Sequence, residues 1–157
     1  MLLQGPVHAA AALLVLAGAQ KVLDPLPLVR ATRSVGWRVP RGVVRTAAVA
    51  EALVGVGALL DGARWSALAV AASYAVFTGF VVLALVRKGV LASCGCFGKA
   101  DTPPSVTHAL VTGGLSAAAL TGVPGSVPLT AAALVTTTAV AVTAYLVLAV
   151  LPTVRAA

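Results

Sequence analysis

Residues 65–86 read WSALAVAASYAVFTGFVVLALV, a run that contains no charged side chain. A helix that crosses the hydrocarbon core of a bilayer needs about 20 consecutive, mainly apolar residues. The run has this length, and Trp65 begins it where an aromatic side chain is expected at the membrane interface. Arg87 follows it directly. The stretch therefore predicts a transmembrane helix.

Comparable apolar runs lie on both sides of this stretch. A transmembrane strand would need only about ten alternating residues, whereas these runs are longer and unbroken, so helices are favoured. We predict an all-α fold: a polytopic membrane helical bundle of four to five transmembrane helices, forming a single domain over residues 1–157. The expected spans are about 5–22, 42–60, 65–86, 106–120 and 127–151.

The overall composition excludes several classes of protein. Hydrophobic residues make up 60% of the 157 residues and charged residues only 10%, which is too few to give a soluble enzyme its polar surface. The same hydrophobicity excludes a disordered chain. The net charge of +7 comes from basic residues that flank the apolar runs, a pattern typical of contact with lipid headgroups rather than nucleic acid. We expect a multi-pass protein of the cell membrane whose partner is the lipid bilayer, with no nucleic acid.

The basic residues are distributed unevenly between the predicted connections. Of all Lys and Arg residues, only Arg64 falls in the connection between the second and third spans. In a five-helix chain all the others lie on the opposite side, together with the cysteines near position 95. The positive-inside rule then predicts a cytoplasmic location for those cysteines.

Glu51 lies near the middle of the second span, where a carboxylate costs about 2.5–3.5 kcal/mol even on lenient scales. Helical spacing puts it beside a face of small residues, Ala48, Ala52 and Gly55, so it is expected to point into the bundle. Two interpretations stay open. Glu51 is a proton relay or ligand contact, or it forms a structural hydrogen bond, either protonated or paired with Lys21 or Arg45.

Three further expectations concern the connections and the third span. Lys21 ends the first helix, where its side chain is expected to extend to the interface. Pro25 and Pro27 are expected to prevent a regular helix in the connection that follows. Hydroxyl groups inside the third span are expected to bond to neighbouring helices; they belong to Ser73, Tyr74 and Thr78.

The chain's two cysteines lie one residue apart in Ser93-Cys94-Gly95-Cys96-Phe97-Gly98. A disulfide across such a short loop is expected to be strained, and a strained disulfide is labile rather than structural. The loop precedes a helix N-terminus, which favours the thiolate. A redox-active pair is therefore the preferred interpretation. A metal site that adds Asp101 and His108, or an inert loop, are the alternatives.

His108 begins the fourth span, close in sequence to the cysteines. A histidine there can act as a general base or a ligand, or it can simply be hydrogen-bonded. The candidate site residues are therefore Cys94, Cys96, Glu51 and His108.

The order of these features resembles the methylamine-utilisation MauE family, within the wider DoxX-like group of membrane proteins. The matching residues are Lys21-Val22-Leu23-Asp24-Pro25, Glu51 followed by Gly55, and Cys94-Gly95-Cys96-Phe97-Gly98. The resemblance implies a small bundle, distantly similar to vitamin K epoxide reductase, that assists maturation of the disulfide-rich methylamine dehydrogenase. Family members often carry an arginine-asparagine pair after the cysteine loop, and residues 105–110 here contain none.

The resemblance implies a thiol-disulfide oxidoreductase in which Cys94 and Cys96 are the redox pair. Its partner would be a thioredoxin-like protein or a disulfide-containing client, and a quinone is the electron acceptor suggested by analogy. Disulfide delivery of this kind requires the cysteines outside the cytoplasm, in conflict with the charge distribution. The alternative function is a non-enzymatic membrane scaffold or small-solute carrier with inert cysteines.

Overall fold

The computed structural model describes residues 4–60, 63–87, 105–121 and 131–146. Every regular element in these ranges is a helix, which confirms the predicted all-α class. The helices are α1 (Gln4–Leu23), α2 (Leu26–Ser34), α3 (Arg41–Leu60), α4 (Arg64–Val86), α5 (Val106–Thr121) and α6 (Ala131–Tyr145).

Three of the described helices are long and apolar enough to cross a membrane. They are Pro6–Leu23 within α1, Arg41–Leu60 and Arg64–Val86, close to the first three predicted spans. Helix α5 is apolar but shorter; its 16 residues extend about 24 Å. Helix α6 covers the described part of the fifth predicted span. The chain is therefore a multi-pass helical membrane protein.

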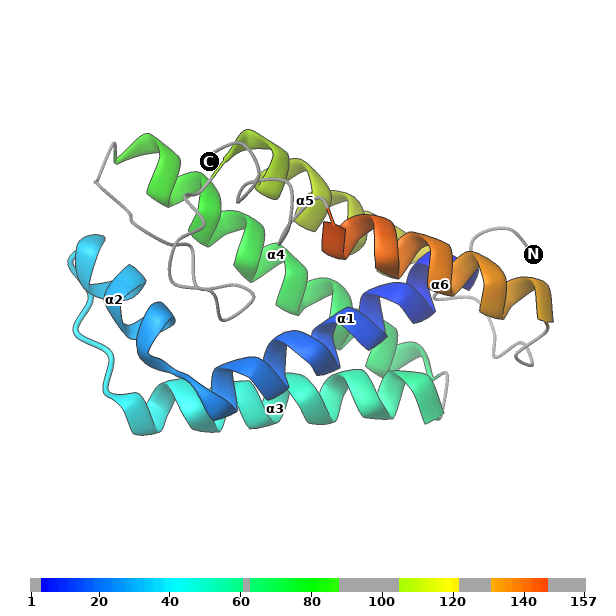
Figure 1. The fold of residues 1–157 in the computed structure, drawn as a ribbon, viewed down its shortest axis with the longest axis horizontal. Helices are drawn as coiled ribbons and strands as arrows, with labels where there is room; N and C mark the ends of the chain where they lie inside the picture. The colour runs from blue at the N-terminus through cyan, green and yellow to red at the C-terminus, as the bar shows by residue number, and fades with distance from the viewer. Residues whose placement is uncertain (1–3, 61–62, 88–104, 122–130, 147–157) are drawn as a thin grey trace.

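Helix α1 lies at the centre of the bundle and packs against α3, α4, α5 and α6 (Figure 1). Helix α4 packs against α3 on one side and α5 on the other. The outward faces carry large apolar side chains, such as Leu53, Val82 and Leu110, which suits contact with lipid. The core between the helices is built mostly from small residues and Leu14, Val70 and Tyr74.

Glycines allow α1 and α3 to approach each other closely. A Cβ atom at Gly18 would lie 2.7 Å from the Ala48 carbonyl oxygen, and one at Gly55 would lie 2.7 Å from that of Ala11. No Cβ fits at such distances from backbone atoms. The small-residue face predicted from Ala48, Ala52 and Gly55 is therefore the surface on which α1 packs.

Hydroxyl groups of α4 were expected to bond to neighbouring helices, and two of the three residues do so. Tyr74 donates to the Ala10 carbonyl oxygen of α1 at 2.9 Å, and the Thr78 hydroxyl lies 2.9 Å from that of Thr112 on α5. Ser73 was expected to do the same, but it donates to the Ala69 carbonyl of its own helix. Ser residues in helices readily bond back in this way.

The connection after α1 contains a helix, which corrects the expectation that its prolines exclude one. Pro25 is the N-cap of α2 and Pro27 lies in the first turn. The N–H groups of a first turn have no intrahelical acceptor, so proline loses no hydrogen bond there. Asp24 also accepts a bond from the Leu26 N–H at 3.1 Å, which secures the entry into the helix.

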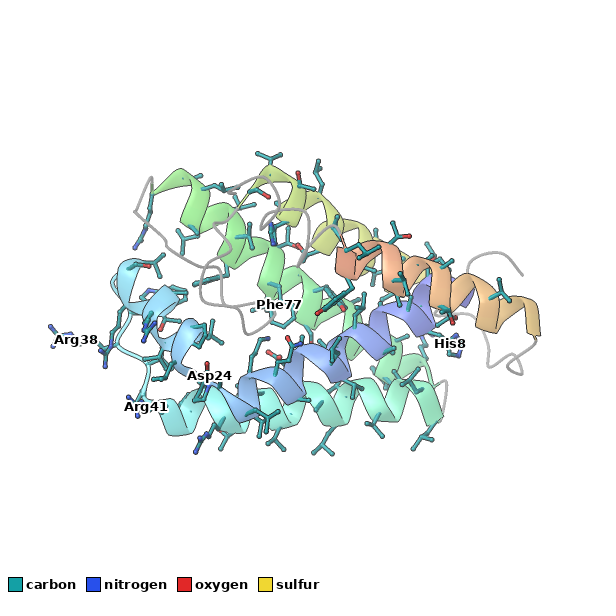
Figure 2. The ribbon with its side chains drawn as sticks, in the orientation of Figure 1. His8, Asp24, Arg38, Arg41 and Phe77 are labelled. Carbon is teal, nitrogen blue, oxygen red and sulfur yellow. The ribbon has the colours of Figure 1, made fainter. Side chains whose placement is uncertain are left out.

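The basic connection and the two helix ends that flank the cysteine segment lie at one end of the molecule. Figure 1 shows α2, the start of α3, the end of α4 and the start of α5 together there. Arg87, after α4, donates a side-chain hydrogen bond to the Val35 carbonyl. Figure 2 places Arg38 and Arg41 at this end and His8 at the other.

Candidate functional site

Glu51 points into the bundle and forms an ion pair with Lys21. The Lys21 ammonium nitrogen lies 2.6 Å from Glu51 Oε2, joining α1 to α3 across their closest contact. The side chain of Lys21 is only 2% exposed and that of Glu51 is 18% exposed. Of the two partners considered for Glu51, the structure therefore selects Lys21, while Arg45 is exposed.

The position of Lys21 corrects the expectation that its side chain extends to the membrane interface. It lies between helices instead, because Glu51 offers a compensating charge inside the bundle. An aromatic ring adds to this environment: the ammonium lies 4.0 Å from the centroid of Phe77 on α4. A cation over an aromatic face is stabilised by about 2 kcal/mol when it is desolvated. Lys21 thus connects α1, α3 and α4.

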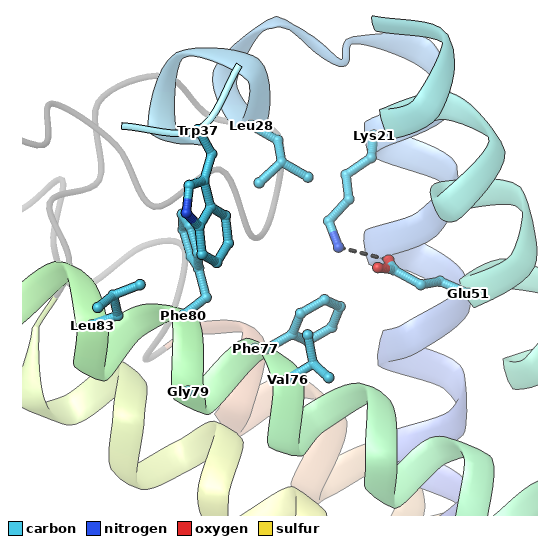
Figure 3. Close-up of a pocket in the computed structure, with 9 residues that line it drawn as sticks. All are labelled: Lys21, Leu28, Trp37, Glu51, Val76, Phe77, Gly79, Phe80 and Leu83. Atoms are coloured by element: carbon cyan, nitrogen blue, oxygen red, sulfur yellow. Dashed lines mark hydrogen bonds and ion pairs between the residues drawn. The ribbon is translucent and has the colours of Figure 1, made fainter. Parts of the chain in front are cut away.

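The ion pair forms one side of a cavity of about 350 Å³. Ligand pockets in proteins measure ~300–1,000 Å³, so the cavity is large enough for a small molecule. Apart from Lys21 and Glu51 the lining consists of apolar residues and one glycine. Figure 3 shows the nine lining residues: Lys21, Leu28, Trp37, Glu51, Val76, Phe77, Gly79, Phe80 and Leu83.

The aromatic side of the cavity depends on a turn after α2. Gly36 has φ = +91°, a conformation that glycine adopts without the strain caused by a Cβ. The turn is closed by hydrogen bonds from the Trp37 N–H to the Thr32 carbonyl (2.8 Å) and from the Gly36 N–H to the Arg33 carbonyl (3.0 Å). This Schellman arrangement ends α2 and directs the chain so that Trp37 meets Phe80, with ring centroids 6.4 Å apart.

His108 is buried in the first turn of α5, with 2% of its surface exposed. The hydroxyl oxygen of Ser105 lies 2.9 Å from His108 Nδ1 and accepts a bond from the His108 N–H at 3.3 Å. Ser105 therefore caps α5 and orients the imidazole. Thr112 donates to the His108 carbonyl at 2.8 Å.

The four predicted site residues fall into three groups. Glu51 is bonded to Lys21 beside the cavity, and His108 is bonded to Ser105 at the start of α5. Cys94 and Cys96 lie outside the described residues, as does Asp101 of the alternative metal site. Among the residues that the structure describes, no group of three His, Cys, Asp or Glu side chains could hold a metal ion.

Sequence reasoning missed the aromatic residues of the cavity. The chain has only two Trp, two Tyr and three Phe, and the cavity contains Trp37, Phe77 and Phe80. One signal was available, because Phe77 and Phe80 are three residues apart and so share a face of α4. The contribution of Trp37 has no such signal, since it depends on how α2 folds back.

The comparison with protein families matches residues 2–125 to the model described as methylamine utilisation protein MauE. The chain belongs to the MauE family. The match extends from α1 through α5, so it includes the Lys21–Glu51 pair, the cavity, the cysteines and His108. No curated protein and no solved structure matches the chain. This MauE-family chain is thus a membrane protein linked to methylamine utilisation.

Proposed function

We propose that this MauE-family protein carries out thiol–disulfide exchange through Cys94 and Cys96 at the cell membrane, in support of methylamine dehydrogenase maturation. The observation that carries the proposal is the Cys94-Gly95-Cys96 sequence within the region matched by the family. Two thiols so close in sequence suit reversible pairing, and the thiolate form of either can take part in exchange.

The proposed exchange conserves atoms and electrons. A thiolate of a disulfide-requiring client attacks the Cys94–Cys96 disulfide, which breaks that bond and forms a mixed disulfide with one cysteine. A second client thiolate then displaces that cysteine. The client gains a disulfide, and Cys94 and Cys96 are left reduced. A thioredoxin-like partner would use the same steps in either direction.

Glu51 and His108 are proposed to handle the protons released or taken up by the thiols. The burial of His108 and its bond to Ser105 support an oriented imidazole, as general bases require. The bond of Glu51 to Lys21 supports a fixed carboxylate with a positioning or ligand-contact role. Glu51→Gln distinguishes these roles from a structural one: unchanged exchange activity and expression would leave Glu51 as a structural hydrogen-bond partner only.

The central test counts reactive thiols in the native protein. The chain has only two cysteines, so alkylation with a mass-tagged maleimide before and after mild reduction reports on this pair alone. We expect two thiols to appear on reduction, to disappear on reoxidation, and to be absent from a Cys94→Ser/Cys96→Ser variant. Client disulfide formation should fail in that variant and persist in Ser93→Ala. Two permanently free, unreactive thiols would instead support a scaffold or small-solute carrier.

The side of the membrane on which exchange occurs needs its own measurement. The basic residues of the α1–α3 connection favour the cytoplasmic side for this end of the bundle, whereas delivery to an exported client requires the opposite side. Labelling of Cys94 and Cys96 in intact cells with a membrane-impermeant maleimide separates the two. Labelling only after lysis would reject exchange outside the cytoplasm.

A further inference from the structure

We propose that the cavity beside the Lys21–Glu51 pair is a binding site for an uncharged, planar, lipid-soluble ring compound with a carbonyl oxygen at its edge, the chemistry of a quinone. The cavity is formed by four parts of the chain: α1, α2 with the turn after it, α3 and α4. All of its lining residues are described, so the binding site stands independently of the cysteines.

The walls of the cavity favour a flat apolar ring. Figure 3 shows Trp37 and Phe80 on one side and the Lys21–Glu51 pair on the opposite side, with Phe77 between them. Aromatic rings prefer offset or edge-to-face contact with other rings, about 4.5–7 Å between centroids. Trp37, Phe77 and Phe80 in the walls are available for such contacts with a planar ring, whereas a bulky, saturated molecule would forgo them.

The ion pair selects the charge of the ligand. Lys21 and Glu51 neutralise each other, so the site has no net charge to attract an ion. An anionic ligand would meet the Glu51 carboxylate, and a cationic one would meet the Lys21 ammonium. Because charged groups are costly in a membrane, an uncharged molecule that reaches the cavity through lipid is favoured.

The same pair supplies the polar contacts that an oxygen-bearing ring needs. The Lys21 ammonium has three N–H donors. One of them donates to Glu51 Oε2 at 2.6 Å, and the ammonium also lies over the Phe77 ring. An N–H that Glu51 does not use is the donor for a carbonyl oxygen, which must approach a side chain that is only 2% exposed. The Glu51 carboxylate accepts only, so it can receive a bond from the hydroxyl that the carbonyl becomes on reduction. The site thus suits both the oxidised and the reduced ring.

One consequence rests on the proposed function of the cysteines. When the Cys94 and Cys96 thiols form a disulfide, they release two electrons and two protons. A quinone that accepts both becomes a hydroquinone, so the disulfide is regenerated without another oxidant. This step uses the binding site but is not needed for binding itself.

Intrinsic fluorescence tests the binding site directly. The full-length protein in lipid nanodiscs is titrated with menadione, a naphthoquinone that quenches nearby indoles. The chain has two tryptophans: Trp37 lines the cavity and is 50% exposed, while Trp65 lies outside the cavity at the start of α4 and is 79% exposed. We expect saturable quenching that Trp37→Phe removes and Trp65→Phe leaves in place. Quenching that is linear in menadione, or equal in both variants, would overturn the site.

A matched pair of glycine variants locates the ligand in the cavity. A Cβ at Gly79 or at Gly57 would meet nothing within 4 Å, but only Gly79 lines the cavity. Gly79→Leu fills the space, so the apparent Kd for menadione should rise at least about tenfold, equivalent to about 1.4 kcal/mol. Gly57→Leu should bind like the wild type. Equal affinity in the two variants would overturn the assignment.

The polar end of the site is tested by removing both charges together. Lys21→Met alone would leave Glu51 unpaired and can unfold the protein, whereas Lys21→Met/Glu51→Leu removes the pair without leaving a lone charge. A second naphthoquinone should displace menadione from the wild-type protein at a concentration at least about tenfold lower than 2-methylnaphthalene requires, because 2-methylnaphthalene has no carbonyl. The double variant should lose this preference. An unchanged preference would show that the pair does not bind the carbonyl.

A cysteine variant separates this proposal from the proposed function. Cys94→Ser/Cys96→Ser should retain the saturable quenching of Trp37 although it cannot form a disulfide. If binding persists in the wild type but menadione never oxidises its thiols, the binding site stands and the redox function fails. If thiol exchange occurs with no saturable binding, the function stands and this site is wrong.

Discussion

Two helix pairs in the same bundle are held together by different means. Between α1 and α3 the backbones approach so closely that Gly18 and Gly55 leave no room for a Cβ, and a buried ion pair crosses the contact. Between α4 and α5 apolar side chains pack together and the polar bonds come from neutral hydroxyl groups, while a Cβ at Gly113 would lie 3.7 Å from the nearest Thr78 atom.

This difference indicates which pair carries the candidate site. Lipid provides no hydrophobic force between helices, so close packing and polar bonds must supply it. Close packing makes α1–α3 intolerant of added volume, and that rigidity holds Lys21 and Glu51 in one geometry. Hydroxyl bonds in membranes average only about 0.6 kcal/mol, so α4–α5 is expected to tolerate change.

The largest effect should come from leaving one charge of the α1–α3 pair without its partner. Glu51→Leu leaves Lys21 buried and unpaired, which should destabilise the protein by about 3–5 kcal/mol. Lys21→Met/Glu51→Leu should recover most of that loss, because both charges are removed together. Unfolding by SDS titration in mixed micelles measures both. A double variant as unstable as the single one would contradict the role of the unpaired charge.

A smaller loss is expected from adding one methyl group to the close helix contact. Gly55→Ala would place a Cβ 2.7 Å from the Ala11 carbonyl oxygen, so the helices must separate at a cost of about 1–3 kcal/mol. Gly57→Ala on the same helix meets nothing within 4 Å and should be neutral or slightly stabilising. The same SDS titration compares them. Equal stability of the two variants would mean that α1 and α3 are farther apart.

The smallest effect should come from the hydroxyl contact between α4 and α5. Thr112→Val keeps the shape of the side chain and removes its bond with Thr78, for an expected loss of about 0.6 kcal/mol. Thr46→Val is the control, because the exposed Thr46 hydroxyl bonds only within α3. A double-mutant cycle with Thr78→Val isolates the interhelical part. A coupling as large as the Gly55→Ala effect would remove the contrast between the two pairs.

The helices of this protein are largely predictable from its sequence. The apolar runs around 5–22, 42–60 and 65–86 correspond to α1, α3 and α4, because length and hydropathy dominate in a bilayer. Helix α2 was not predicted. Its prolines look like helix breakers in sequence, and only their position in the first turn makes them compatible with a helix.

The candidate site was predictable only in part. Glu51 stands out because a carboxylate in an apolar run is rare, and its inward orientation follows from the small residues beside it. Its partner does not follow in the same way, since both Lys21 and Arg45 are near. The choice depends on α1 lying against α3, which places Lys21 between the helices and leaves Arg45 exposed.

Hydropathy, charge and small-residue spacing in the sequence were enough to assign a multi-pass helical bundle and to select Glu51. The resemblance to the MauE family rested on short motifs, above all Cys94-Gly95-Cys96-Phe97-Gly98. These are local properties, and each can be read within one helix or one motif. The cavity is different. Lys21, Trp37, Glu51 and Phe77 come from separate elements and meet only when α2 folds back and α1 packs on α3. Contacts between residues distant in sequence depend on the geometry of several helices at once, so only the tertiary structure could decide them.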